Sequence, residues 1–438
     1  MESQSSLPVS SPAPIAPPLL NWAGNYRYST TRLAQADSVE QVQELVQTTD
    51  QLKVLGSRHC FNGIADSTQQ LLSLGAAETD IYLDAAARTV TVPASITYGR
   101  LAPYLHSHGF ALHNLASLPH ISVVGACATA THGSGIQHGN LATAVRAMEF
   151  VLASGEVRVL SQENDGDEFQ GAVVHLGALG VITKLSLAIE PTFQLCQDVY
   201  ENLPLDQVCE HFAAIQASAY SVSLFTDWQD QRITQVWLKQ RLTPGAQLQQ
   251  APPDFFGAPR ATQNLHPLAG LSPINCTEQM GVPGPWHDRL PHFRLGFTPS
   301  SGEELQSEYF VPLRHAEEAI RAVAGLHKYL RPCLQVSEMR TVAADALWLS
   351  PCYQQNSLAI HFTWKPDEAA VSQVLPLLER ALSPFGVRPH WGKLFILSAA
   401  HLQSQYEKLP AFQALMAQYD PKGKFRNAFV NTYLANSL

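Results

Sequence analysis

Three extended runs in the last third of the chain constrain the fold most, because polar and apolar residues alternate along them. They cover residues 334–342, 358–364 and 388–395. Residues two apart in a β-strand share a face. Trp391 and Lys393 are therefore expected to share one, and the runs predict a single antiparallel sheet whose apolar face is covered by helices. The other face would carry Glu338, Arg340, His361, Thr363 and Lys393.

Polar groups gathered in the middle of a sheet face cost free energy unless they bind something. The alternative is an exposed sheet face with ordinary salt bridges, which is common. Tryptophan and phenylalanine residues beside these charges weigh against that alternative. We therefore predict that this face binds a polar ligand.

A glycine-containing turn follows an apolar run that ends at Leu55. The turn contains Gly56, Ser57, Arg58, His59 and Cys60. Small residues at the end of a strand let backbone amides approach an anion closely. Taken by itself, this stretch is better described as a surface turn with an incidental histidine.

A second loop, residues 115–135, is dense in Gly, Ala, Ser and Thr. Its small residues leave room for a ligand against the backbone, and its hydroxyls and amides suit a pyrophosphate. The spacing is not G-x-G-x-x-G, so the loop is not a Rossmann fingerprint. A tightly packed helix followed by a turn explains the pattern equally well.

The remaining pattern predicts a helix that starts at Ser38 with Gln41 reaching back, a strand through Leu55, and a helix that ends at Gly109. It also predicts strands at 81–83, 89–92 and 181–189, a hairpin of 148–152 with 157–160, and a helix at 169–176. Pro191 lies near an expected domain boundary. Beyond it we expect strands at 221–226, 233–238 and 307–311 and a helix at 317–330. The irregular segment 243–294 is either functional or disordered, and its aromatic content favours an ordered lid or an oligomer contact.

Composition excludes several classes of protein. With 45% hydrophobic and 15% charged residues and a net charge of −9, the chain suits neither a disordered nor a nucleic-acid-binding protein. No apolar run is long enough to span a membrane, and residues 1–20 read as a disordered arm without signal-peptide features. Seven scattered cysteines without a C-x-x-C pair argue against a disulfide framework and a metal site. A cytoplasmic protein is expected.

Eight motifs together are similar to those of the alditol oxidases (xylitol oxidase-like), within the vanillyl-alcohol oxidase flavoprotein family. They are NWAGN (21–25), GSRH (56–59), SLPHIS (117–122), the 125–135 loop, GVI (180–182), SEMR (337–340), HFT (361–363) and HWGK (390–393). The resemblance implies an α+β fold with a two-subdomain FAD-binding domain of the PCMH type at 21–192. A substrate (cap) domain with an antiparallel sheet flanked by helices would follow at 193–405, and residues 406–438 would return to the FAD-binding domain.

The resemblance also implies FAD linked covalently to His59. Cys60 stands where relatives usually have serine, which could alter a hydrogen bond near the link. The implied cofactor-binding residues are Leu55, Gly56, Ser57, Arg58, His59, Cys60, Ser117, Ser122, Gly125, Ala126, Ala128, Thr129, His132, Gly133 and Ile182.

The implied reaction moves hydride from the terminal carbinol of a polyol to flavin N5, and oxygen then yields hydrogen peroxide. Glu338 would accept from substrate hydroxyls, Arg340 and Lys393 would stabilise developing charge, and His361 would transfer the proton. Ser117 and Thr363 would orient the polyol, and the small Ala116 would admit oxygen. The alternatives are an aldonolactone oxidase or dehydrogenase and a non-catalytic flavin- or sugar-binding protein. A monomer is expected, while the preferred polyol and the electron acceptor stay open.

Overall fold

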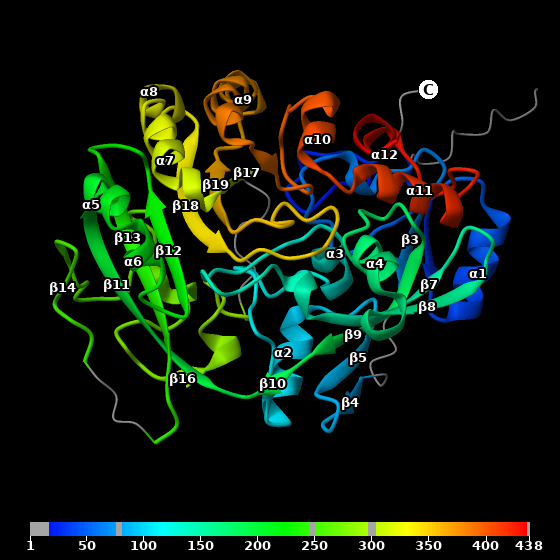
Figure 1. Cartoon of the computed structure of the whole chain (residues 1–438), viewed down its shortest axis with the longest axis horizontal. Coiled ribbons are helices and arrows are strands. Elements are labelled where there is room, and N and C mark those ends of the chain that lie inside the picture. Colours follow the sequence, from blue (N-terminus) through cyan, green and yellow to red (C-terminus); the bar gives the residue numbers. More distant parts are fainter. Residues whose placement is uncertain (1–16, 76–80, 246–249, 297–303, 436–438) are drawn as a thin grey trace, which may run out of the picture.

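The computed structural model describes residues 17–75, 81–245, 250–296 and 304–435 (Figure 1). Within them, two small sheets of three and five strands and one large sheet of eight strands are accompanied by two further strand pairs. Of the expected disordered arm, residues 1–16 lie outside the described part, and Leu20 forms a bridge to Arg27. Within the described ranges, no helix has the length and apolar character needed to cross a membrane.

The first sheet is parallel, with strand order β1-β3-β2: β1 (Leu33–Ala36), β3 (Gln70–Leu74) and β2 (Leu52–Val54). Helix α1 (Val39–Thr48) lies between β1 and β2 in the chain. The Ser38 hydroxyl accepts from the backbone N–H of Gln41, as predicted. Gln41 reaches back to the N–H of Asp37, one residue before the N-cap.

The second sheet is antiparallel, with order β4-β5-β9-β7-β8, and contains the predicted strand pair and hairpin. Its strands are β4 (Tyr82–Asp84), β5 (Thr89–Pro93), β9 (Val181–Ala188), β7 (Val145–Val151) and β8 (Val157–Ser161). Helix α2 (Tyr98–Ser107) ends just before Gly109, whose φ of +83° favours glycine. Helix α4 (Gln162–Val173) begins seven residues earlier than the prediction of 169. Strands β6 (Phe110–Ala111) and β10 (Glu190–Pro191) form a separate pair.

The large sheet has eight antiparallel strands in the order β16-β11-β13-β12-β18-β19-β17-β20. Four belong to the first half of the sheet: β16 (Gly284–Pro285), β11 (Gln194–Pro204), β13 (Arg232–Arg241) and β12 (Ser221–Thr226). The others are β18 (Leu334–Val342), β19 (Ser357–Trp364), β17 (Leu305–Pro312) and β20 (Arg388–Pro389). Helices α7 (Ala316–Ala324), α8 (His327–Leu330) and α9 (Glu368–Leu382) cover one face (Figure 1). The predicted helix 317–330 is thus two helices, α7 and α8. The combination of helices with separate antiparallel sheets confirms the predicted α+β fold class.

The third predicted strand, 388–395, is wrong beyond Pro389. The chain turns there, because the N–H of Gly392 donates to the Nδ1 atom of His390 and the N–H of Lys393 donates to the carbonyl oxygen of His390. Trp391 and Lys393 consequently do not share a strand face. The Trp391 ring is buried against Tyr406, with ring centroids 5.0 Å apart.

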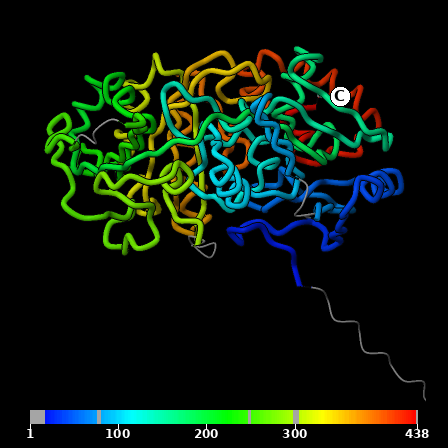
Figure 2. The backbone as a smooth tube through the Cα atoms, turned by 90° about the horizontal axis from the view of Figure 1, so that it is seen from below, coloured from blue at the N-terminus to red at the C-terminus, as the bar shows by residue number. Residues whose placement is uncertain are grey.

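The C-terminal segment returns to the first sheet through helices α10 (Ala399–Gln405), α11 (Leu409–Tyr419) and α12 (Ala428–Tyr433). The buried Lys53 ammonium donates to the carbonyl oxygen of Phe425, and the Asn427 amide donates to that of Gly63. In Figure 2 the blue N-terminal elements and the red C-terminal helices accordingly occupy the same end, and the green strands of the large sheet lie at the other. The remaining α-helices and strands are short: α3 (Val123–Ala128), α5 (Leu205–Glu210), α6 (Phe212–Gln216), β14 (Asp254–Phe255) and β15 (Ala258–Pro259).

Candidate active site

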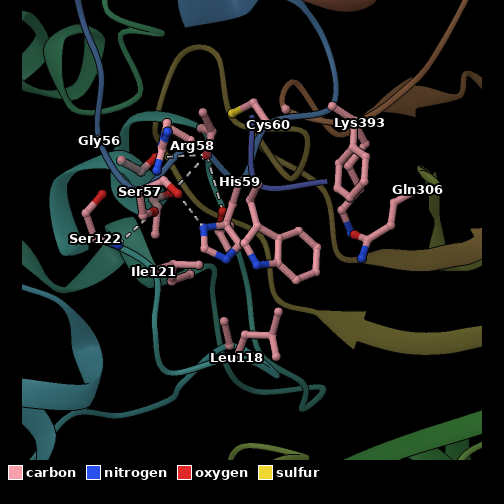
Figure 3. Close-up of a pocket in the computed structure, with 18 of the residues that line it drawn as sticks. Gly56, Ser57, Arg58, His59, Cys60, Leu118, Ile121, Ser122, Gln306 and Lys393 are labelled. Carbon is pink, nitrogen blue, oxygen red and sulfur yellow. Dashed lines mark hydrogen bonds between the residues drawn. The ribbon is translucent and has the colours of Figure 1, made fainter. Parts of the chain in front are cut away.

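A cavity of about 740 Å³ lies where the two glycine-containing loops face the polar side of the large sheet. Figure 3 shows Gly56, Ser57 and Ser122 on one side, Lys393 and Gln306 on the other, and His59 between them. Segments from both small sheets and from strands β17, β18 and β19 line it. The cavity thus joins the residues that the sequence assigned to a cofactor with those that it assigned to a substrate.

The two loops are held together at Ser122. Its backbone N–H donates to the hydroxyl of Ser57 at 3.1 Å. A Cβ on Gly56 would lie 2.8 Å from the Ser122 hydroxyl oxygen, and one on Gly125 would lie 2.6 Å from it. Gly56 therefore allows the close approach of the two loops, whereas Gly125 makes room for the Ser122 hydroxyl within the second loop. The second loop contains the short helix α3 followed by a turn, as the packing alternative predicted, and it also lines the cavity.

His59 presents a neutral imidazole to the cavity. Burial lowers the pKa of His59 to about 4. Its Nδ1 atom lies 2.9 Å from the Ser57 carbonyl oxygen and so carries the proton. The Nε2 atom is buried and has no hydrogen-bond partner among the described residues. Trp22 stacks on the ring with centroids 5.0 Å apart, and Arg58 adopts a left-handed φ of +61° that turns the loop.

All but one of the predicted cofactor-binding residues lie in the cavity wall. The exception is Gly133, which packs against Asn114 and Leu115 behind the wall. The large cavity, the glycines that let backbone approach, and the unpartnered buried imidazole fit a flavin nucleotide. The residues on the wall are Leu55, Gly56, Ser57, Arg58, His59, Cys60, Ser117, Ser122, Gly125, Ala126, Ala128, Thr129, His132 and Ile182.

The predicted polar residues meet on the sheet. Glu338 on β18 is directly opposite His361 on β19 in the strand register. The Lys393 ammonium reaches the same place from the turn after β20 and lies 2.7 Å from His361 Nδ1. Thr363 lies 3.1 Å from His361 Nε2. Arg340 donates to the Ser117 hydroxyl at 3.2 Å, which connects the sheet to the second loop.

Two acidic–basic contacts at the centre of this cluster were not predicted. Glu308 on β17 lies 2.6 Å from the Lys393 ammonium. His292, from the irregular segment, lies 2.8 Å from Glu338. Glu308 could have been found, because it occupies an inward position opposite His361 in the predicted strand 307–311. His292 lies outside any periodic pattern, so the sequence offered no signal for it.

The cluster has strongly perturbed protonation equilibria. Burial alone would raise the pKa of both carboxyl groups, but Lys393 and His132 hold the pKa of Glu308 well below its usual range. Arg340 and His292 similarly hold that of Glu338 well below its usual range. Burial and the nearby Lys393 charge lower the pKa of His361 to about 4. Two carboxylates, the Arg340 guanidinium, the Lys393 amine and a neutral imidazole therefore face the same cavity.

Known proteins show similarity over most of the chain. A family model described as FAD binding domain matches residues 30–161, and one described as D-arabinono-1,4-lactone oxidase matches residues 302–433. An alditol oxidase of Streptomyces sp. (strain IKD472 / FERM P-14339) is 47% identical, covering 94% of this chain and 98% of that protein. An L-gulonolactone oxidase of Mus musculus is 26% identical over 94% of this chain and 96% of that protein. The crystal structure of cholesterol oxidase from Brevibacterium sterolicum superposes with a TM-score of 0.76 at 13% identity, covering 98% of this chain and 100% of that chain, a likeness in fold.

Proposed function

The chain belongs to the alditol oxidase family of FAD-dependent oxidoreductases, and we propose that it oxidises the terminal primary alcohol of a polyol, of the xylitol or sorbitol type, to the aldose. The observation that carries this proposal is the dense set of charged and hydroxyl groups on one wall of the cavity. A polyol has little apolar surface, so its binding depends on such a network. Bound FAD would supply the redox chemistry, as the hydride acceptor at N5 and as the source of the two electrons that reduce oxygen to hydrogen peroxide.

The two loops would hold the flavin nucleotide. Ser57, Ser122 and the backbone around Gly125 contribute donors and close approach. His59 is the proposed site of covalent attachment, because its neutral ring keeps a free lone pair at the cavity wall. The Cys60 thiol beside it stays protonated, since burial raises the pKa of Cys60 to about 12.

The polar face would hold the polyol. Glu338 accepts from neighbouring substrate hydroxyls, while Arg340 and Lys393 donate and stabilise developing negative charge. His361 takes the hydroxyl proton, and Ser117 and Thr363 orient the chain of the polyol. Ala116, buried and on the cavity wall, leaves space for oxygen.

The proposal also includes the domain limits, the cellular location, the oligomeric state and the electron acceptor. The FAD-binding part would span residues 21–192, the substrate part 193–405 and the returning segment 406–438. We further propose that the protein works as a cytoplasmic monomer, with oxygen as electron acceptor and without nucleic acid or membrane partners.

An aldonolactone oxidase is the second candidate, because the lactone oxidase model matches residues 302–433, which contain most of the polar face. The two functions are separated by measuring peroxide production with xylitol and sorbitol against galactono-lactone. Turnover of the polyols is expected. Activity confined to the lactone would overturn the polyol assignment, and the absence of turnover on both would favour a non-catalytic flavin- or sugar-binding protein.

A further inference from the structure

Glu308 is the most connected side chain of the polar cluster, although the proposed reaction assigns it no role. Its side chain is 1% exposed and touches four basic groups. Oε2 lies 2.6 Å from Lys393 Nζ and 3.8 Å from His361 Nδ1, whereas Oε1 lies 3.0 Å from His132 Nε2 and 3.4 Å from Arg340 Nη2. A buried carboxylate tolerates this environment only because it is fully paired.

His132 connects this carboxylate to the second loop. The imidazole is buried, with Nδ1 2.7 Å from the Gly133 carbonyl oxygen and Nε2 3.0 Å from Glu308. Both ring nitrogens therefore face oxygen atoms, one of the Gly133 backbone and one of the Glu308 carboxylate. The contact fixes the large sheet to the loop that is proposed to hold the cofactor.

Lys393 depends on this carboxylate more than on the strand register. It lies in a turn after β20 and not in a strand, so no ladder hydrogen bond sets its direction. Its ammonium reaches the cluster through two short contacts, to Glu308 and to His361. Removing Glu308 would leave only the neutral imidazole to orient it.

We propose that Glu308 is a positioning residue that, held in place by His132, fixes both the direction and the positive charge of Lys393 toward the polyol. The inference rests on the proposed function, because it assigns a task within that same site. Glu308 lines the same cavity, but its carboxylate is paired with Lys393, and we assign it no contact with the substrate.

The electrostatics of the site support this role. Burial lowers the pKa of Lys393, and Glu308 opposes that effect. The other charged and titratable groups that face the pair are Arg340 and Glu338 on β18, His361 on β19, His132 on the second loop and His390 in the turn. Of these groups, only Glu338 favours the ammonium form of Lys393, as Glu308 does. Glu308 makes the direct contact with that ammonium.

The test is the Glu308→Gln variant of the holoenzyme. The ionisation of Lys393 is measured across pH by competitive labelling with acetic anhydride and mass spectrometry. We expect the labelling midpoint of Lys393 to fall by about one to three pH units, since a neighbouring opposite charge shifts a pKa by that much. With a polyol, the alkaline fall of kcat/KM should move to lower pH by the same amount, with kcat affected more than KM. A midpoint equal to that of the wild type would overturn the proposal.

Glu379→Gln is the matched control. Glu379 is another buried carboxylate, and it accepts from Tyr309, the neighbour of Glu308 that points to the opposite face of β17. The Glu379→Gln variant should have a lower thermal stability and an unchanged labelling midpoint of Lys393. If Glu308→Gln does not fold, Glu308→Asp decides: an intermediate midpoint supports the proposal and a wild-type midpoint overturns it. Labelling needs no substrate, so the two proposals are tested separately. A wild-type protein that oxidises no polyol would contradict the proposed function, while the labelling midpoint would still test the role of Glu308.

Discussion

The Nε2 atom of His292 lies 2.8 Å from Oε1 of Glu338, and this contact brings the irregular segment 243–294 to the polar face of the large sheet. The other ring nitrogen faces the ammonium of Lys239 at 3.4 Å, so Nδ1 accepts and Nε2–H donates to the carboxylate. Burial lowers the pKa of His292 to about 4, which keeps the ring neutral. Among its described residues the segment is therefore an ordered part of the cavity wall.

His292→Phe should weaken polyol oxidation without unfolding the protein. Phe225 and Trp237 surround the ring and would accept a phenyl group. The Glu338 carboxylate would lose a donor worth about 1.5–3 kcal/mol, so kcat/KM for xylitol should fall roughly 10- to 100-fold. His287→Phe, from the same segment but without a contact to Glu338, is the control. Equal kinetics for both variants and the wild type would contradict the role of His292.

Lys393→Met should slow reduction of the flavin by polyol strongly while the flavin stays bound. The methionine fills similar space but removes the cation 2.7 Å from His361. Loss of one preorganised donor at a developing charge costs about 100- to 1,000-fold in rate. Stopped-flow absorbance with xylitol measures the rate, and the protein-bound flavin spectrum verifies loading. Reduction at the wild-type rate would remove Lys393 from the chemistry.

The strand alternation correctly predicted which side chains gather on the sheet. Glu338 and His361 had to share a face once β18 and β19 paired in register, because the period of a strand is fixed. The same logic failed for Lys393, which reaches the cluster from a turn set by hydrogen bonds to His390. Local side-chain-to-backbone bonds of this kind override an alternating pattern, and they leave no periodic signal.

Two residues of the site, Glu308 and His292, were not predicted, and the reasons differ. Glu308 lies on a strand whose limits were nearly right, but a single inward acidic residue gave no hint of its four partners. His292 acts from an irregular segment, where position depends on tertiary contacts such as the donation of its N–H to the Ser117 carbonyl oxygen. Identification of the flavin loops came from resemblance, since their spacing alone fitted a packed helix equally well.

Protonation of buried histidines should make the fold sensitive to mild acid. Burial lowers the pKa of His361 and His292 to about 4 and that of His175 to about 3. Near pH 4 to 6.5 the unfolded chain binds protons that the folded chain does not. The free energy of unfolding therefore falls as pH drops through this window, by about 1.4 kcal/mol per pH unit for each group. Asp345, whose pKa burial raises to about 6, offsets one of the three.

Thermal unfolding between pH 4.5 and 7.5 tests this directly. The Tm should decline steadily below about pH 6.5, and His175→Phe, which removes one titrating group next to Phe150, should make the decline shallower. A Tm that is constant or higher at the acidic end would show that these histidines are not buried in the neutral form.

Gly133→Ala should displace the second loop even though this glycine does not line the cavity. An added Cβ would lie 2.6 Å from the carbonyl oxygen of Leu115, a backbone atom that cannot move alone. Overpacking of this kind costs about 1–3 kcal/mol, and it would also disturb the contact between His132 and the Gly133 carbonyl oxygen. We expect a lower Tm and reduced flavin content. Gly296→Ala, where a Cβ meets open space, is the control, and equal Tm values for the two variants would contradict the argument.

His59→Ala tests the covalent link. Wild-type protein precipitated with acid should keep yellow fluorescence in the pellet, whereas the variant should release its flavin to the supernatant. The reason is that the alanine lacks the free ring nitrogen that faces the cavity. His120→Ala is a suitable control, because it removes another imidazole from the second loop. Its own Nε2 bonds to the Leu295 carbonyl oxygen. Flavin released from the wild type, or retained in the pellet of His59→Ala, would show that the link is absent or lies on another residue.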